Sequence, residues 1–246
     1  MELPAKCLDY YQYYGDEEAL KQTFPHFQNA ISWFWKYLDP QDYLLSHVPY
    51  WCFIDWSFPH DKPGKWAILS AQFMDVLLFL SEVAVKFGRY ELSAQYSTMA
   101  GQMKQSIEDT FWDEEEGCYR DYILEDGTLH GFSYSTNSYL ILKDIAPQSK
   151  ITAIISRIFE YPGSEENIKA QIDEYYTKRQ SHHTFGDTLK DKVIVAQPFF
   201  MHHVNKMFNK IGRYDLLMKY LKKWLPMLTI GKTGTIWETW SIDGSE

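Results

Sequence analysis

The chain has 246 residues, 45% of them hydrophobic, which is enough to bury a large core in one domain. Its formal net charge of -9 at pH 7 argues against a nucleic-acid backbone or an anionic membrane as a partner. The 9 Trp, 18 Tyr and 15 Phe residues exceed what a core requires, which favours an enzyme or a sugar-binding protein over a plain scaffold.

The cysteines Cys7, Cys52 and Cys118 are odd in number and follow no pattern, so we expect free thiols and neither a disulfide framework nor a zinc site. The N-terminus has no signal peptide, and no stretch reaches the ~18 apolar residues of a membrane span. We therefore expect a soluble protein, cytoplasmic if the chain start is native.

Two helices are predicted at the start of the chain, over residues 7–14 and from Asp16 to about Tyr37. Gly15 is expected to close the first helix and Asp16 to cap the second. Pro25 is expected to break or kink the second helix. Its apolar stripe recurs every three or four residues, at Leu20, Phe24, Phe27, Ile31, Phe34 and Leu38.

Residues 38–63 form a long predicted loop that ends in Trp51-Cys-Phe-Ile-Asp-Trp-Ser-Phe58. Loops of this length in a compact domain are usually functional or disordered, and four aromatic rings argue against disorder. Asp55 lies among these rings and is a candidate site residue. The alternative is that Asp55 caps a helix or braces the loop.

Helical segments of two kinds alternate later in the chain. Residues 66–87 are apolar on nearly every face and residues 92–111 on one stripe, and 193–211 and 214–228 repeat this order. The turns Lys86-Phe-Gly-Arg-Tyr-Glu-Leu92 and Lys210-Ile-Gly-Arg-Tyr-Asp-Leu216 are near copies. Repeated hairpins of a buried and a half-exposed helix indicate a solenoid or a closed helical toroid with two layers.

The segment between these pairs begins with an acidic, glycine-containing turn over residues 111–123, which is expected to form a small hairpin. Helices are predicted over residues 133–143, 150–161 and 164–177. The polar run 178–191 is expected to be a surface loop.

Several common site motifs are absent or incomplete. Gly231-Lys232-Thr233 resembles the end of a P-loop, but that motif needs a glycine where this chain has Pro226. The histidine pairs 182–183 and 202–203 are adjacent, whereas helical metal ligands lie four residues apart. Neither a nucleophile elbow nor a dinucleotide fingerprint is present. We expect no metal and no cofactor.

The most distinctive stretch lies near the C-terminus, where Glu238 stands between Trp237 and Trp240. Indole faces stack on sugar rings, and an apolar rim tends to raise the pKa of a carboxyl group toward working pH. The alternative is an aromatic helix start that packs on a neighbour. Hydrolysis of a glycosidic bond uses two carboxyl groups, and Asp55 and Glu238 both lie beside aromatic residues.

These residues resemble a known family. The motifs that carry the resemblance are Tyr13-Tyr14-Gly15-Asp16, Phe53-Ile54-Asp55-Trp56, Phe111-Trp112-Asp113-Glu114, Gln197-Pro198-Phe199-Phe200 and Thr235-Ile236-Trp237-Glu238-Thr239-Trp240. They are similar to motifs in the catalytic domain of bacterial α-L-rhamnosidases, glycoside hydrolase family 78. The resemblance covers essentially the whole chain. It implies an all-α (α/α)6 toroid, an inverting mechanism, Glu238 as general base, flanked by Trp237 and Trp240, and a sugar subsite lined by Asp55 and Trp56.

The chain also departs from this family. The family's general acid lies in an Asp-x-x-x-Arg-x-Glu stretch that has no counterpart here, and the only Arg-x-Glu, Arg89-Tyr90-Glu91, belongs to a repeated turn. Roughly eight of the twelve toroid helices are predicted, so we expect a partial domain truncated at both ends, with little hydrolysis on its own and a tendency to self-associate.

The expected partner is an oligosaccharide or a rhamnosylated small molecule. Two alternatives stay open, a non-catalytic helical-repeat module that binds carbohydrate or protein, and another six-hairpin glycosidase or lyase.

Overall fold

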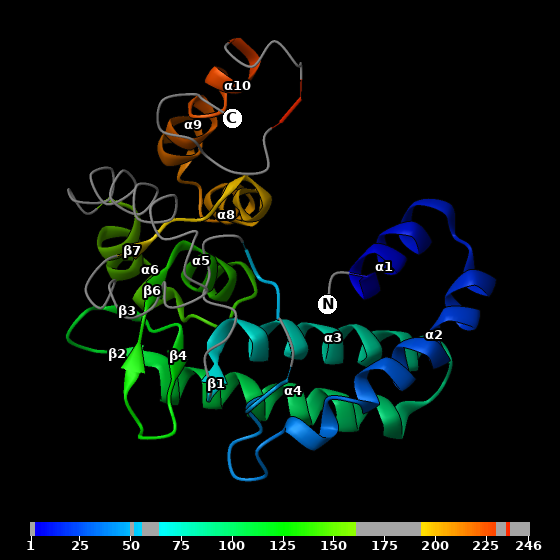
Figure 1. Ribbon diagram of the computed structural model, residues 1–246. Coiled ribbons are helices and arrows are strands. Elements are labelled where there is room, and N and C mark those ends of the chain that lie inside the picture. The colour runs from blue at the N-terminus through cyan, green and yellow to red at the C-terminus, as the bar shows by residue number, and fades with distance from the viewer. Residues whose placement is uncertain (1–2, 50–51, 56–63, 161–192, 230–234, 237–246) are drawn as a thin grey trace. The chain divides into compact units, whose positions relative to one another are not determined.

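The computed structural model describes residues 3–49, 52–55, 64–160, 193–229 and 235–236, and this part of the chain is mostly helical, as predicted (Figure 1). The chain separates into two compact units, one of residues 1–49 and 63–110 and the other of residues 50–62 and 111–246. The predicted helix over 164–177 and loop over 178–191 lie outside the described residues.

The first unit begins with α1 (Leu3–Tyr14) and α2 (Glu17–Ser32), followed by the short 3-10 helix η1 (Trp35–Tyr37). Gly15 joins the helices with a φ of 67°, and the Asp16 side chain accepts a hydrogen bond from the Ala19 N–H at 2.9 Å. The predicted stripe buries Leu20, Phe24, Phe27 and Ile31. The two helices are confirmed, but α2 continues past Pro25 and ends at Ser32, before the predicted end near Tyr37.

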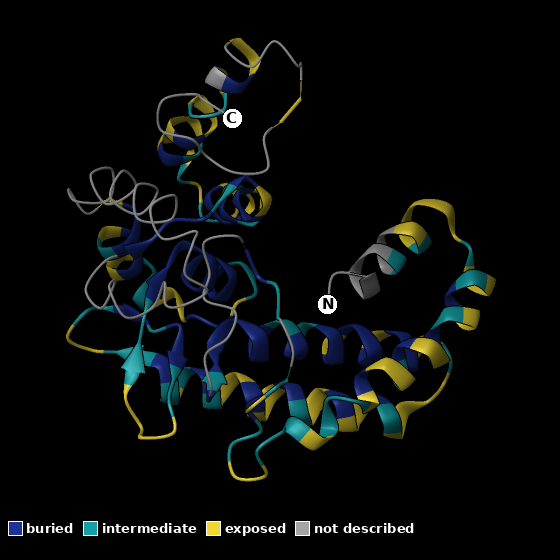
Figure 2. Cartoon of the chain, in the orientation of Figure 1, coloured by how far each residue is buried: buried dark blue, intermediate teal, exposed yellow. Residues whose placement is uncertain are grey.

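A second helix pair completes the first unit. It consists of α3 (Ala67–Lys86), which follows the short strand β1 (Lys65–Trp66), and α4 (Tyr90–Phe111). Most of α3 is buried, whereas α4 buries only one stripe, as Figure 2 shows. The Ser81 hydroxyl of α3 contacts the hydroxyls of Ser93 and Ser97 on α4 at 2.8 and 2.6 Å. This confirms the predicted pairing of a buried and a half-exposed helix.

By length and composition α3 could cross a membrane, so the expectation that no stretch is long and apolar enough for a span was wrong. However, 72% of its most apolar window is buried inside the protein, which is the pattern of a core helix.

The two near-copy turns have the same local structure. Gly88 and Gly212 have φ values of 69° and 73°, in the left-handed region that favours glycine. In each turn the N–H of the residue after the glycine donates a hydrogen bond to a carbonyl of the preceding helix. The Arg89 N–H bonds the Ala84 carbonyl at 2.8 Å, and the Arg213 N–H bonds the Phe208 carbonyl at 2.9 Å. The sequence repeat is therefore a repeat of the helix-closing turn.

The second unit begins with short strands. Strands β2 (Trp112–Asp113) and β3 (Cys118–Tyr119) form the predicted antiparallel hairpin, and β4 (Tyr122–Ile123) pairs with β5 (Leu129–His130). Strand β6 (Phe132–Ser133) then leads directly into α5 (Tyr134–Leu142), which is almost wholly buried (Figure 2).

The helix predicted over 150–161 is α6 (Gln148–Ile154), which continues as a π-helical turn, η2 (Ile155–Phe159). The helix predicted from residue 193 begins later, because residues 193–194 form strand β7 (Val193–Ile194) and α8 (Pro198–Lys210) starts at the proline. Val193, Ile194 and Val195 are β-branched and fit a strand, and a proline is favoured at the first position of a helix.

The last predicted helix is divided into α9 (Tyr214–Lys222) and α10 (Leu225–Thr229). α9 packs on α8 through Tyr220, whose ring stacks on Phe208 with centroids 5.4 Å apart. The Tyr220 hydroxyl lies 2.7 Å from that of Tyr134 on α5. This aromatic core holds α5, α8 and α9 together.

Candidate active site

The starts of α5 and α8 lie at the same end of this helix pair. The strands that lead into them, β6 and β7, pair in parallel, with Phe132 opposite Val193 and Ser133 opposite Ile194. The chain therefore enters both helices in the same direction, and the two helices pack against each other. Helix N-termini carry a partial positive charge, so this end of the pair favours carboxylates and polar ligands.

Asp55 lies at the start of α8. Its Oδ2 accepts a hydrogen bond from the backbone N–H of Gln197, the N-cap residue, at 2.7 Å. The Asp55 side chain is fully buried. A hydrogen bond from an N–H at a helix N-terminus to a carboxylate is stronger than one between neutral groups. In this structure, Asp55 therefore fastens the segment 52–55 to α8, and the sugar contact implied by the family resemblance stays a prediction.

A second contact joins the same two segments. The ring of Phe53 meets that of Phe199 edge to face, with centroids 5.2 Å apart and an interplanar angle of 61°. Phe53 and Asp55 thus contact α8 at Phe199 and at Gln197 respectively. Two contacts two residues apart on each segment fix the register of the loop on the helix.

A second buried carboxyl group, that of Asp121, lies at the start of α5. Ser133 caps α5 by accepting a hydrogen bond from the Thr136 N–H at 2.9 Å, and its hydroxyl donates to Asp121 Oδ1 at 2.5 Å. Gly131 passes so close that a Cβ there would lie 2.6 Å from Asp121 Oδ2. Ser133 and Gly131, just before α5, therefore both lie against this carboxyl group.

Burial raises the pKa of Asp121 to about 7, although hydrogen bonds from Ser133 and Thr136 and the positive charge of Arg120 lower it. Sequence reasoning missed this residue. The only signal was its position between Arg120 and Tyr122 within the predicted hairpin over residues 111–123, which is also typical of an exposed turn residue.

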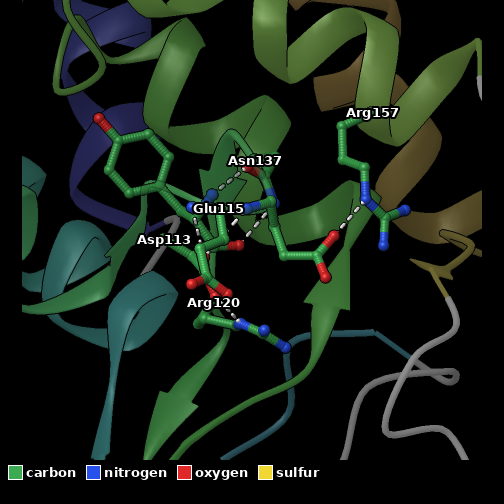
Figure 3. Close-up of polar contacts among 7 residues, drawn as sticks. Asp113, Glu115, Arg120, Asn137 and Arg157 are labelled. Carbon is green, nitrogen blue, oxygen red and sulfur yellow. Dashed lines mark hydrogen bonds and ion pairs between the residues drawn. The ribbon is translucent and has the colours of Figure 1, made fainter.

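The hairpin β2–β3 is held by ion pairs (Figure 3). Asp113 pairs with Arg120, Oδ2 to Nε 2.7 Å, and its Oδ1 accepts hydrogen bonds from the N–H groups of Glu115 and Glu116. Burial raises the pKa of Asp113, but these hydrogen bonds and the charge of Arg120 hold it below its usual value. Arg157 of η2 pairs with Glu116, Nε to Oε2 2.7 Å.

These charged groups also support the entry to α5. The guanidinium groups of Arg120 and Arg157 lie 3.7 and 4.9 Å from the ring centroid of Phe132 in β6. The Asn137 side chain of α5 bonds both the N–H and the carbonyl of Tyr119, each at 2.9 Å. The hairpin is therefore a scaffold for the start of α5.

Of the site residues predicted from the sequence, only Asp55 lies in the described part of the chain. Trp56, Trp237, Glu238 and Trp240 lie outside it. The proximity of Asp55 and Glu238 thus stays a prediction.

A hollow of about 520 Å³ opens in the first unit and is lined by Lys36, Tyr37, Leu38, Asp39, Pro40, Gln41, Ser46 and His47. Its carboxylate, Asp39, pairs with Lys65 at 2.7 Å, and the hydrogen bond from Lys65 lowers the Asp39 pKa. An ion-paired carboxylate with a lowered pKa is a poor general acid, so the start of α5 and α8 is the better candidate site.

No group of three or more His, Cys, Asp or Glu side chains that could hold a metal ion occurs within the described ranges. In the pair His202–His203 the rings lie 3.7 Å apart, and His202 Nδ1 contacts the Phe199 carbonyl at 2.9 Å.

Residues 2–245 match the family model described as the bacterial alpha-L-rhamnosidase 6 hairpin glycosidase domain. No curated protein matches the chain. Solved structures do match it. A family 78 rhamnosidase of Bacillus sp. GL1 has a TM-score of 0.72 at 20% identity, and the match covers 96% of this chain and 22% of that one.

A rhamnosidase from Klebsiella oxytoca with rhamnose bound has a TM-score of 0.66 at 16% identity, over 96% of this chain and 39% of that one. An alpha-L-rhamnosidase from Dictyoglumus thermophilum has a TM-score of 0.57 at 17% identity, over 93% of this chain and 22% of that one. These likenesses show the fold, and the chain spans well under half the length of each of these three proteins.

Proposed function

The chain belongs to the bacterial α-L-rhamnosidase six-hairpin glycosidase family, and from this premise we propose that it forms part of an enzyme that hydrolyses terminal α-L-rhamnosides with inversion. Glu238 is the proposed general base. Asp55 and Trp56 are the proposed residues of the sugar subsite, and Trp237 and Trp240 flank the base. The substrate is an oligosaccharide or a rhamnosylated small molecule.

The hydrogen bond from Gln197 N–H to Asp55 Oδ2 is the observation that best supports this proposal. It holds the residue before Trp56 at the start of α8, where the N-terminal ends of α5 and α8 lie together. Polar groups near helix N-termini suit the binding of a hydroxyl-rich ligand.

In the proposed reaction Glu238 accepts a proton from a water molecule as the water oxygen bonds to the anomeric carbon. The bond from that carbon to the leaving oxygen breaks on the opposite face, and an acid donates a proton to the leaving oxygen. Inverting enzymes hold acid and base roughly 6.5–9.5 Å apart. The only Arg-x-Glu in the chain, Arg89-Tyr90-Glu91, lies at the start of α4, and we assign it no catalytic role.

With a proposed base and no assigned acid, the rate at which this chain hydrolyses a glycoside should depend strongly on how readily the leaving group departs. A dinitrophenolate departs without protonation, whereas a methoxide does not. We expect the chain to hydrolyse 2,4-dinitrophenyl α-L-rhamnoside slowly and methyl α-L-rhamnoside not at all. A second candidate function, sugar binding without hydrolysis, is favoured by the missing acid motif, and it predicts binding of both glycosides and turnover of neither.

The test of the base is Glu238→Gln, with Glu91→Gln as the matched control. Loss of a general base should lower turnover of the dinitrophenyl glycoside by roughly 100-fold or more, because general-base catalysis contributes about that much. Affinity for methyl α-L-rhamnoside, measured by calorimetry, should stay within about twofold, since the two side chains have nearly the same shape. Undiminished turnover in Glu238→Gln would remove this residue from the role of base.

A further inference from the structure

The hollow in the first unit has the size of a ligand site. Its volume of about 520 Å³ lies within the range of roughly 300–1,000 Å³ that is typical of small-molecule pockets. One continuous segment, residues 36–41, forms most of its wall, and Ser46 and His47 complete it. All of these residues belong to the first unit, whereas Asp55 belongs to the second. The proposed function therefore does not explain this hollow.

The loop that lines the hollow has an unusual backbone conformation. Tyr43 and His47 have φ values of 59° and 52°, in the left-handed region that bulky residues rarely adopt. Such residues persist only where the surrounding contacts enforce them, and they cluster at functional sites. Here the His47 N–H donates to the Gly64 carbonyl at 3.0 Å, and the Ser46 N–H donates to the Tyr37 carbonyl at 2.8 Å. These contacts hold His47 in the wall of the hollow in spite of the strain.

The carboxylate in the wall is already engaged by the protein. Asp39 Oδ2 pairs with Lys65 Nζ at 2.7 Å, and Asp39 Oδ1 accepts the Gln41 N–H at 2.9 Å. Lys65 Nζ also pairs with Asp42 at 2.5 Å. Each oxygen of Asp39 therefore has a donor, and Lys65 offsets part of its charge. Because one ammonium group serves two carboxylates, a ligand with two negative charges would be repelled more strongly here than a ligand with one.

Lys36 lines the hollow and has no carboxylate partner within the described part of the chain. Its Nζ lies over the rings of Trp33 and Tyr37, 5.1 and 4.9 Å from their centroids. Such contacts are weak at exposed sites, but two of them together restrict where the ammonium group can lie. The Gln41 side chain adds amide donors to the same wall. An unpaired ammonium group beside an amide favours an anionic ligand.

We propose that this hollow binds a small organic monocarboxylate. The Lys36 ammonium group and the Gln41 side-chain amide receive the carboxylate, and the body of the ligand packs against Tyr37, Leu38 and Pro40. An inorganic anion has no apolar surface for these three residues to cover, so a carboxylate on a ring-sized body fits best. The inference does not depend on the proposed function.

The test uses benzoate and benzamide, which have nearly the same shape and differ in charge. In NMR titrations of the isotope-labelled chain at low salt, benzoate should bind roughly three- to fivefold more tightly than benzamide, the value of an exposed ion pair. Raising NaCl from about 20 to about 500 mM should remove most of this preference, because salt screens exposed charges. Equal affinity for the two probes at low salt would overturn the proposal.

The role of Lys36 is tested with two substitutions. Lys36→Met removes the charge and should abolish the preference for benzoate while the affinity for benzamide stays the same, whereas Lys36→Arg keeps the charge and should keep most of the preference. Lys86→Met is the matched control. Lys86 is an exposed lysine at the end of α3 in the same unit, and its Nζ lies 4.7 Å from the ring centroid of Tyr11. This control should bind both probes as the wild type does.

The same titrations locate the bound probe. The largest shifts on addition of benzoate should occur at the amides of Lys36, Gln41 and Ser46. Largest shifts at the Gln197 amide, at the start of α8, would instead place the anion in the second unit and overturn the proposal. A preference for benzoate that survives in Lys36→Met, or that falls equally in Lys86→Met, would also overturn it.

Discussion

Asp121 is a carboxyl group without exposed surface, and burial raises its pKa to about 7. Its pKa in the unfolded chain is close to the ordinary value of 3.8, so between these two values the folded state binds the proton that the unfolded state has lost. The stability that this proton contributes is complete below about pH 4. It is lost as the pH rises through about 7.

We therefore predict that the free energy of unfolding falls between pH 4 and pH 8 by an amount on the order of 4 kcal/mol from Asp121 alone. Asp121→Asn cannot ionise and should flatten this part of the pH profile, which urea unfolding at several pH values would measure. Asp126→Asn is the control, because Asp126 is exposed and its hydrogen bonds with Thr128 lower its pKa, so its effect has the opposite sign. A profile unchanged by Asp121→Asn would show that Asp121 is ionised when folded.

Gly131 lies beside the same carboxyl group, which leaves no space for a side chain at this position. It has a φ of 74°, and a Cβ there would lie 2.6 Å from Asp121 Oδ2. Gly127, in the neighbouring turn, has a φ of 81° with nothing within 4 Å of a Cβ. Gly127→Ala should destabilise the protein by about 1–2 kcal/mol from backbone strain, and Gly131→Ala by roughly a further 1–3 kcal/mol from the clash. Equal losses in thermal or urea unfolding would mean that the carboxyl group moves aside freely.

At the scale of elements, the start of α8 depends on a loop from a distant part of the sequence. Asp55 accepts the Gln197 N–H, and without it this N–H would lack its charged partner. Asp55→Ala should cost about 1.5–3 kcal/mol, the range for hydrogen bonds to charged groups, whereas Asp55→Asn keeps an acceptor and should cost less. Hydrogen exchange at the Gln197 amide should speed up in Asp55→Ala and much less in Asp55→Asn. Equal exchange in both variants would contradict this contact.

The helices were predictable because their apolar stripes and glycine turns are local signals. Leu20, Phe24 and Phe27 predicted the buried face of α2, and the repeat at Gly88 and Gly212 predicted two hairpins of the same kind. The strand β7 was missed because it consists of two residues whose pairing with β6 is set by tertiary contacts. The division of α9 from α10 likewise carries no local signal that we recognised.

The candidate site was predictable only in part. Asp55 was found because aromatic residues surround it in the sequence, and the structure adds its partner, which is 142 residues away. Asp121 was missed because its burial depends on Ser133 in β6 and on Gly131 just before that strand, which are ten or more residues away in the sequence. Patterns of residue type show which groups can do chemistry, but burial and long-range hydrogen bonds decide which of them are placed to do it.

For the whole molecule, fold and family agree. The helical-hairpin repeats predicted a solenoid or a layered toroid of helical hairpins, and residues 2–245 match the model of a 6 hairpin glycosidase domain. Fold alone does not determine function, because one scaffold hosts many chemistries. The rhamnoside hydrolysis that we propose therefore depends on specific side chains, above all the proposed base Glu238 and the proposed sugar-binding segment that Asp55 holds.

A calorimetric titration of the 246-residue chain with methyl α-L-rhamnoside, beside its diastereomer methyl α-L-fucoside, which differs from it at C2 and C4, tests this account most directly. A site built for rhamnose should bind the rhamnoside saturably at one site and more tightly than the fucoside, because buried polar groups left unpaired by the wrong stereoisomer cost affinity. Binding of neither glycoside, or of both equally, would contradict the account.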